Sequence, residues 1–223
     1  SEIEFAGDSR ITEISQGAFA FCTALKYIDI PEGVEKIGPM AFTGDDRLKS
    51  AELRQTLTEI SYRAFYNCTR LESVNLPTQL QTVGDLAFYY AGLTEITLPQ
   101  SVKTIGKGAF HSCTSLKTAR VESDVTAIDC GVFGYCTALE SVYLPQTLQK
   151  IEGAFFMDDS FIMGHAFHNC ASLKDVYFAG SEEQWNAVQI IVGKTPDDNS
   201  SVTVNGATYD NTAVKNAVKH YGI

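Results

Sequence analysis

The sequence predicts a repeat solenoid, mainly β, with a parallel β-sheet on one face, irregular or 3₁₀ connections on the other, and a small C-terminal cap. Two observations carry this prediction. An apolar frame recurs every 22 or 23 residues through most of the 223-residue chain. Each unit also contains a short alternation of apolar and polar residues, which is typical of a strand with one buried side. A unit of this length holds too few residues for a full helix and a strand together.

Three positions define the frame: an Ile or Val, a Phe that follows Ala in all units but one, and a Leu. They are Ile14, Ile37, Ile60, Val83, Ile105, Ile128 and Ile151; Phe19, Phe42, Phe65, Phe88, Phe110, Phe133 and Phe167; and Leu25, Leu48, Leu71, Leu93, Leu116, Leu139 and Leu173. Within the first unit Ile28 and Ile30 flank Asp29, so the strand should bury both isoleucines. Inward positions predicted for that unit are Ile11, Ile14, Ala18, Phe19, Cys22, Leu25, Ile28 and Ile30.

The repeated units resemble those of the BspA-like leucine-rich repeat family. The stretches LKYIDIPEGVEKIGPMAF and LESVNLPTQLQTVGDLAF carry the resemblance, which covers seven units over residues 11–181. It implies a right-handed leucine-rich repeat superhelix in a secreted or cell-surface protein, mostly of host-associated bacteria, that works in adhesion or protein binding. Family membership constrains the fold far more than the ligand.

An open solenoid needs a cover at each end. Residues 1–10 are predicted to form a truncated capping repeat, because Ile3 and Phe5 alternate with Glu4 before the first full unit. Residues 182–223 are predicted to form a C-terminal cap made of a helix, a hairpin and a short helix.

The cap's first helix is predicted from Ser181 and Gln184, which form a capping box. We interpret Trp185 as a lid over the apolar end of the solenoid, with a ligand platform as the alternative. The hairpin is predicted from alternating residues around Asn205-Gly206, and the last helix spans 212–221 with Val214, Val218 and Tyr221 on one face.

Two units depart from the period. The fourth is one residue short at Tyr89-Tyr90-Ala91-Gly92, a loss that we expect to be neutral. The seventh carries an apolar insertion over about 152–163, which includes Phe156 and Phe161. This insertion either folds back on its own solenoid or presents an exposed apolar contact to a partner.

The charge excludes several classes of partner. Seventeen Lys and Arg against 27 Asp and Glu give a net charge of −10 and a pI near 4.8, so nucleic acid and anionic membranes should be repelled. No apolar stretch is long enough to insert in a membrane, and the start has no signal peptide. Because the chain begins at Ser1 instead of methionine, we expect a processed or trimmed piece of a longer protein.

The reactive residue types follow the repeat. Five of the six cysteines share one position, three residues after the Phe: Cys22, Cys68, Cys113, Cys136 and Cys170. We interpret them as an inward ladder of reduced thiols, with disulfides between Cys113 and Cys136 or Cys136 and Cys170 as the alternative. Cys130 stands outside the ladder, where it could be exposed, and is interpreted as an unreactive thiol.

Catalytic and metal-binding motifs are not found in the sequence. His165 and His168, which follow Asp158 and Asp159, are the nearest approach to a ligand cluster, but the repeat frame places Phe167 inward between them. The sequence contains no nucleophile elbow, phosphate-binding glycine loop or H-E-x-x-H motif. We therefore expect no enzyme activity, no cofactor and no metal.

The outward strand positions form two columns that we predict to be the binding surface. The candidate partner-binding residues are Tyr27, Asp29, Glu52, Asn75, Glu95, Thr97, Arg120, Tyr143 and Tyr177, with Phe156 and Phe161 of the insertion. Tyrosine, hydroxyl and scattered charged side chains suit an adaptable protein-binding face, although strand surfaces favour Thr and Tyr in any case.

The predicted function is a non-catalytic recognition or adhesion module. Its partner would be a host matrix or surface protein, another bacterial protein or, as an alternative, a glycan. The competing hypothesis is a structural spacer within a larger surface protein, with no ligand of its own.

Overall fold

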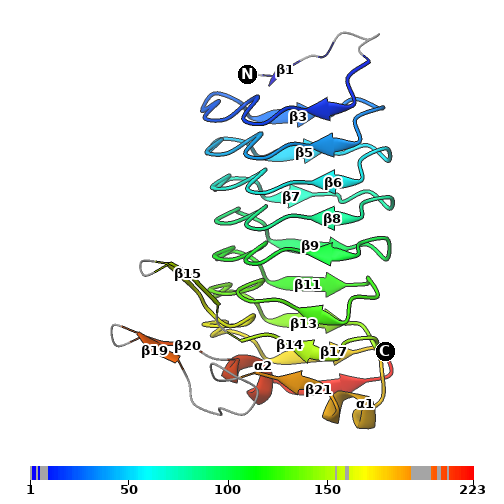
Figure 1. Ribbon diagram of the computed structural model, residues 1–223, viewed down its shortest axis with the longest axis vertical. Helices are drawn as coiled ribbons and strands as arrows, with labels where there is room; N and C mark the ends of the chain where they lie inside the picture. Colours follow the sequence, from blue (N-terminus) through cyan, green and yellow to red (C-terminus); the bar gives the residue numbers. More distant parts are fainter. Residues whose placement is uncertain are drawn as a thin grey trace.

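The computed structural model describes residues 2–3, 5, 10–153, 155–158, 161–191, 202–204, 207–209 and 211–223. The chain winds into an elongated stack of similar turns, with the N-terminal strand at one end and the helical cap at the other (Figure 1). Each turn rests only on its neighbours, so the predicted solenoid is confirmed.

The outward columns lie on a face of parallel strands, which we call the sheet face. It has two sections: β1 (Glu2–Ile3), β3 (Tyr27–Asp29), β5 (Ser50–Glu52) and β7 (Ser73–Val74), followed by β9 (Glu95–Leu98), β11 (Thr118–Val121), β13 (Ser141–Leu144), β17 (Asp175–Phe178) and β21 (Val218–Tyr221). Ile28 is buried between the exposed Tyr27 and Asp29, as the alternation predicts.

A second parallel ladder corrects the expectation of a single sheet. Seven of its two-residue strands carry the frame Ile or Val: β2 (Glu13–Ile14), β4 (Lys36–Ile37), β6 (Glu59–Ile60), β8 (Thr82–Val83) and β10 (Thr104–Ile105), then β12 (Ala127–Ile128) and β14 (Lys150–Ile151). The ladder ends with β18 (Gln189–Ile190), which follows the repeat frame in the cap. The repeat period places equivalent backbone groups of successive turns directly above one another. Short extended segments can therefore pair with the next turn and satisfy their backbone hydrogen bonds.

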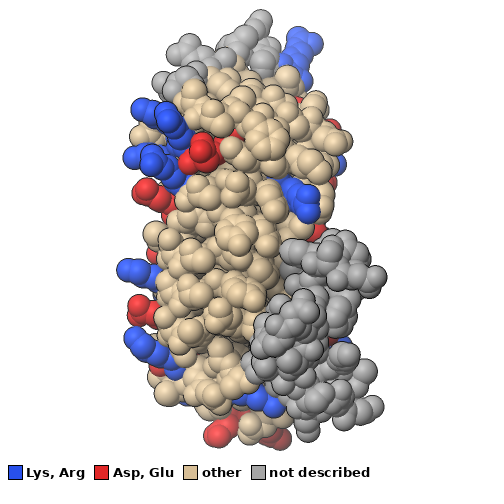
Figure 2. All heavy atoms as spheres, turned by 90° about the vertical axis from the view of Figure 1, so that its left-hand side faces the viewer, with Lys and Arg blue, Asp and Glu red and all other residues tan. Residues whose placement is uncertain are grey.

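The Ala-Phe segments form the third side of each turn, which we call the turn face. Their backbone N–H groups alternate in direction: the Phe19 N–H donates to Ala41 O in the next turn, while the Cys22 N–H donates to Phe19 O within its own turn. The described Ala-Phe connections are therefore irregular turns. Figure 2 views this face, whose middle is largely uncharged, with most Lys, Arg, Asp and Glu side chains along its edges.

The Phe of each unit forms a continuous spine. Consecutive rings from Phe19 to Phe167 stack with centroids 5.1–5.7 Å apart, and all but Phe19 are fully buried. The first turn is less covered: Ala18, predicted to point inward, is exposed, and Phe19 and Cys22 are half-buried. Among the described residues, Phe5 lies beyond this turn and packs edge-on against Phe19.

The two ends are closed differently. At the N-terminal end β1 pairs with β3, which confirms the truncated strand. At the other end α1 (Glu182–Asn186) begins with the predicted capping box, because the Gln184 N–H donates to Ser181 Oγ and the Gln184 side chain accepts from the Ser181 N–H. Trp185 is buried and packs edge-on against Phe178, so it acts as the lid.

The last predicted helix is wrong beyond its first five residues. Helix α2 (Thr212–Asn216) ends early, and β21 then pairs in parallel with β17 to extend the sheet face. Lys219 takes an inward position of this strand, and its ammonium donates to the Lys215 and Ala217 carbonyls. Because Lys219 is charged at a position that faces inward, residues 218–221 do not show the apolar and polar alternation that predicts a strand. The hairpin of β19 (Val202–Val204) and β20 (Ala207–Tyr209) is confirmed, while Asn205 and Gly206 lie outside the described residues.

Both irregular units alter the stack. The shortened fourth unit, expected to be neutral, coincides with the interruption of the sheet face between β7 and β9. A Cβ on Gly92 would lie 2.4 Å from Thr69 O, so only glycine fits the shortened turn. The insertion forms an antiparallel hairpin of β15 (Phe155–Asp158) and β16 (Phe161–Met163). The side chains of Phe156 and Phe161 lie outside the described part of the chain.

Candidate binding surface

The strand register brings the predicted columns together. Thr97, Arg120, Tyr143 and Tyr177 are aligned across β9, β11, β13 and β17, and His220 of β21 continues the same column. In the first section of the sheet face Asp29 is aligned with Glu52, and Tyr27 with Ser50 and Ser73. The predicted residues therefore form two separate groups and not one continuous surface.

Four side chains of the second section form a stack, which we call the aromatic column: Arg120, Tyr143, Tyr177 and His220. The Tyr143 and Tyr177 rings lie 4.4 Å apart at 8°, and the Tyr177 and His220 rings lie 4.4 Å apart at 15°. The Arg120 Cζ lies 3.6 Å from the centroid of the Tyr143 ring, a cation–π contact. Both faces of each tyrosine are thus covered.

His220 completes the column and was not predicted from the sequence. Its Nε2 lies 2.8 Å from Asp175 Oδ1, a neighbour in the adjacent column. Sequence reasoning placed this residue on a helix, so it could not foresee the contact. The only signal was the short apolar and polar mixture of residues 218–221, which is too brief to distinguish a strand from a helix.

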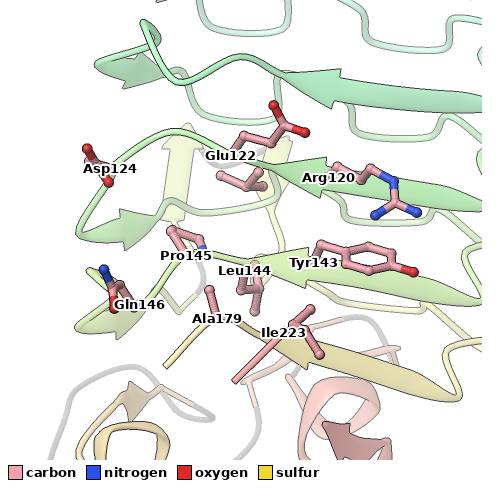
Figure 3. Close-up of a pocket in the computed structure, with 10 residues that line it drawn as sticks. Arg120, Glu122, Asp124, Tyr143, Leu144, Pro145, Gln146, Ala179 and Ile223 are labelled. Atoms are coloured by element: carbon pink, nitrogen blue, oxygen red, sulfur yellow. The ribbon is translucent and has the colours of Figure 1, made fainter. Parts of the chain in front are cut away.

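A hollow of about 580 Å³ opens beside the aromatic column (Figure 3). Pairing between β11 and β13 ends at Arg120 and Tyr143, one residue before the pairing of β13 with β17 ends. The strands β11 and β13 separate there, and the hollow lies between them at that point. Its lining is Arg120, Val121, Glu122, Asp124, Tyr143, Leu144, Pro145, Gln146, Ala179 and Ile223.

The lining of this hollow combines an apolar base with a charged rim. Leu144 and Pro145 are buried, Ile223 is an exposed apolar side chain, and Glu122 and Asp124 are exposed carboxylates. The Arg120 guanidinium has no ion pair among the described residues, so its hydrogen-bond donors remain available to a ligand. The hollow can accept an apolar group and hydrogen-bond donors or acceptors at once.

The other predicted residues are differently engaged. Asp29 is held by Arg54 in a two-point ion pair, with Arg54 Nη2 2.5 Å from Asp29 Oδ2 and Nε 3.1 Å from Oδ1. Tyr27 is half-exposed, and Glu52 is exposed. Asn75, Glu95 and Thr97 line a smaller hollow of about 260 Å³ at the interruption between β7 and β9.

The cysteine ladder is an interior structure of free thiols. Cys68, Cys113, Cys136 and Cys170 are buried, and each Sγ donates to the carbonyl of the Phe in the preceding turn at 3.1–3.2 Å. Burial raises the pKa of Cys113 and Cys170 to about 12, so these thiols remain protonated and poorly nucleophilic.

Cys130 is buried, which corrects the expectation that it could be exposed. It packs with Leu86 and Tyr89, and its Sγ lies 3.0 Å from Asp129 Oδ1. Burial, followed by the Asp129 carboxylate, raises the pKa of Cys130 to about 12. Its interpretation as an unreactive thiol is consistent with this pKa.

The histidines near the insertion lie in the interior. His165 and His168 are buried, and the His168 ring packs edge-on against Tyr135. Within the described residues no three His, Cys, Asp or Glu side chains converge as metal ligands would. In the same part of the chain no helix is long and apolar enough to span a membrane.

The stacked parallel strands, the Phe spine and the capped ends define a leucine-rich repeat solenoid. The sequence pattern described as the BspA type leucine rich repeat region, in six copies, matches residues 1–90 and 35–163. These matches span more than half of the chain, which belongs to the BspA-type leucine-rich repeat family. No curated protein matches the chain significantly in sequence.

Several solved structures of bacterial proteins are similar to the structure of this chain. A leucine-rich repeat protein from Bacteroides ovatus has a TM-score of 0.59 at 23% identity, over 75% of this chain and 59% of that one. The T. pallidum leucine-rich repeat protein TpLRR has 0.59 at 33%, over 61% and 64%. The pneumococcal vaccine antigen PcpA has 0.59 at 22%, over 73% and 38%. The chain thus matches less than two thirds of the length of each.

Proposed function

We propose that the chain is a non-catalytic protein-recognition or adhesion module of a secreted or cell-surface bacterial protein, and that it binds its partner through the aromatic column and the adjoining hollow. The observation that carries the proposal is the stack of Arg120, Tyr143, Tyr177 and His220 beside a hollow of about 580 Å³. Tyrosine and arginine are the side chains that most often dominate protein interfaces.

The stacking geometry favours a protein partner over a glycan. A sugar ring that packs on a tyrosine needs an open ring face, but both faces of Tyr143 and Tyr177 are occupied by their neighbours. What the column offers is ring edges, phenol hydroxyls and a guanidinium, which hydrogen-bond well to peptide groups and carboxylates. Stacked rings also lose little conformational entropy when a partner binds.

A surface location is proposed from the family and from one similar structure. PcpA is described as a pneumococcal vaccine antigen, and a vaccine antigen must be accessible to antibodies. We extend that accessibility to this chain as part of the proposal. A further contact from the insertion hairpin, through Phe156 and Phe161, belongs to the same proposal.

The test is binding of the purified chain to an array of host matrix proteins, bacterial surface proteins and glycans. The variants Arg120→Thr and Tyr143→Thr each replace a residue of the aromatic column by threonine. The aligned position of β9 already carries threonine, Thr97. The control Tyr27→Ser removes an exposed tyrosine from the first section with the residue found at Ser50 and Ser73. We expect at least about tenfold weaker binding for the column variants and unchanged binding for the control.

Two results would overturn the proposal. Equal loss in the column variants and the control would show that binding does not depend on this site. Silence across the whole array, with a folded chain, would favour the alternative of a structural spacer that holds other parts of a larger protein apart.

A further inference from the structure

The turn face contains a third hollow, far from the aromatic column and near the N-terminal end of the stack. Its volume is about 630 Å³, and its larger lining side chains are Phe21, Met40, Arg63 and Tyr66. An outer stack of rings on the turn face starts at Tyr66 and passes through Tyr89 to His111.

The hollow exists because this outer stack stops. The position of Tyr66 in its unit, one residue after the Phe, is filled by Thr43 in the second turn and Ala20 in the first. The two small side chains leave a step beneath the Tyr66 ring, and both line the hollow. Phe21, of which 70% is exposed, forms the opposite wall.

A fixed and unneutralised cation lies in this apolar hollow. The Arg63 Cζ is 4.9 Å from the centroids of both Tyr62 and Tyr66, so two rings hold the guanidinium in place. Among the described residues its side chain makes no ion pair, and its buried Nε has no hydrogen-bond acceptor. A partly desolvated guanidinium without a counter-charge is costly, and an incoming anion would relieve that cost.

We propose that this hollow binds a peptide segment of a partner protein in which an acidic side chain stands beside an apolar one. The planar fork of Arg63 matches a carboxylate in two-point geometry, while Phe21 and Met40 supply an apolar wall for the neighbouring side chain. Arg63 is the one charged side chain among the described residues that line the hollow. This proposal does not depend on the aromatic column.

The repeat itself supplies variants that should fold. Met40 occupies in the second turn the position of Arg63 in the third, and both have a positive φ, 57° and 54°. Arg63→Met therefore removes the cation without new backbone strain. Phe21 has a φ of 59° at the position where another turn carries Asn67, also at 59°, so Phe21→Asn removes the apolar wall in the same way. The exposed Arg47 provides a control, Arg47→Gln.

The experiment is a titration of the ¹⁵N-labelled chain with two blocked dipeptides, acetyl-Leu-Asp-amide and acetyl-Leu-Asn-amide, followed by amide chemical shifts. We expect the aspartate peptide to shift the amides of Gly17, Ala20, Gly44 and Arg63, and the asparagine peptide to bind about tenfold more weakly. Arg63→Met should abolish this preference for aspartate, Phe21→Asn should weaken both peptides, and Arg47→Gln should change nothing.

The comparison of the two peptides on the unaltered chain keeps the test independent of how the variants fold. Equal affinity for both peptides would overturn the proposal, because the hollow would then not distinguish a carboxylate from a neutral amide. So would shifts scattered over the whole surface, or no shift at millimolar peptide. If Arg63→Met has a lower melting temperature than the unaltered chain, its binding is compared with that of Phe21→Asn, which keeps the guanidinium.

Discussion

Asp45 occupies in the second turn the position that carries a cysteine in five of the seven turns. Its replacement by cysteine should make the free energy of unfolding less dependent on pH. The side chain is fully buried. Its Oδ1 accepts a 2.7 Å hydrogen bond from the Cys22 N–H, but its Oδ2 has no partner among the described residues. Burial is the main cause that raises the pKa of Asp45 to about 7.

The sign of the effect follows from this raised pKa. Between pH 3.8 and 7 the folded chain holds a proton on Asp45 that the unfolded chain has lost, so stability falls as pH rises through this window. At about 1.4 kcal/mol per pH unit, the free energy of unfolding should fall by about 2 kcal/mol between pH 5.5 and pH 8 through this one group. The whole effect, from pH 3.8 upward, is about 4 kcal/mol at most.

The ladder explains why cysteine should be tolerated. The neighbouring rung, Cys68, donates its thiol to the Phe42 carbonyl, and a cysteine at 45 would have the carbonyl of Phe19 in the equivalent place. Asp45→Ala is a second variant, because Ala91 already occupies this rung in the fourth turn. Its cavity lowers stability by an amount that does not vary with pH.

The assay is urea unfolding at pH 5.5 and pH 8. We expect the stability of Asp45→Cys relative to the unaltered chain to rise by about 2 kcal/mol between the two values, and Asp45→Ala to show the same rise from a lower start. Replacement of the exposed Asp124 by asparagine serves as the control. An identical difference at both pH values would refute the reasoning, since Asp45 would then titrate as it does in the unfolded chain.

Three further predictions concern the interior. Phe65→Ala should lower the free energy of unfolding by about 3 to 5 kcal/mol in urea, because the ring is fully buried between Phe42 and Phe88; a loss under about 1 kcal/mol would contradict the spine. Gly106→Ala should cost about 1 to 3 kcal/mol, because its Cβ would lie 2.3 Å from Asp85 N; an unchanged melting temperature would argue against this close approach. Cys136, whose pKa burial raises well above its usual value, should resist iodoacetamide in the folded chain by mass spectrometry, and rapid labelling would place it outside the core.

Much of the repeat frame could be predicted because its period is a geometric constraint. When equivalent residues recur every 22 or 23 positions, they must lie above one another, so the Phe spine, the thiol ladder and the strand columns follow from sequence positions alone. The capping box at Ser181 was predictable for a similar reason, since it depends only on residues three apart.

The second ladder was harder to foresee. Two-residue strands such as β4 carry too short an alternation to be recognised, and they form only because the neighbouring turn presents matching backbone groups. The same reason applies to β21, which is stabilised by pairing with β17 and carries Lys219 at an inward position.

The sequence by itself determined the class of fold, most of the core residues and the face on which Arg120, Tyr143 and Tyr177 lie. Only the tertiary structure decided that His220 joins them, that a hollow opens where β11 and β13 separate, and that the turn face has a step beneath Tyr66. The physical reason is that a repeat period sets which residues lie above one another in the stack and point in the same direction. Stacking distances, the ends of strand pairing and the gaps left by small side chains depend on contacts between turns.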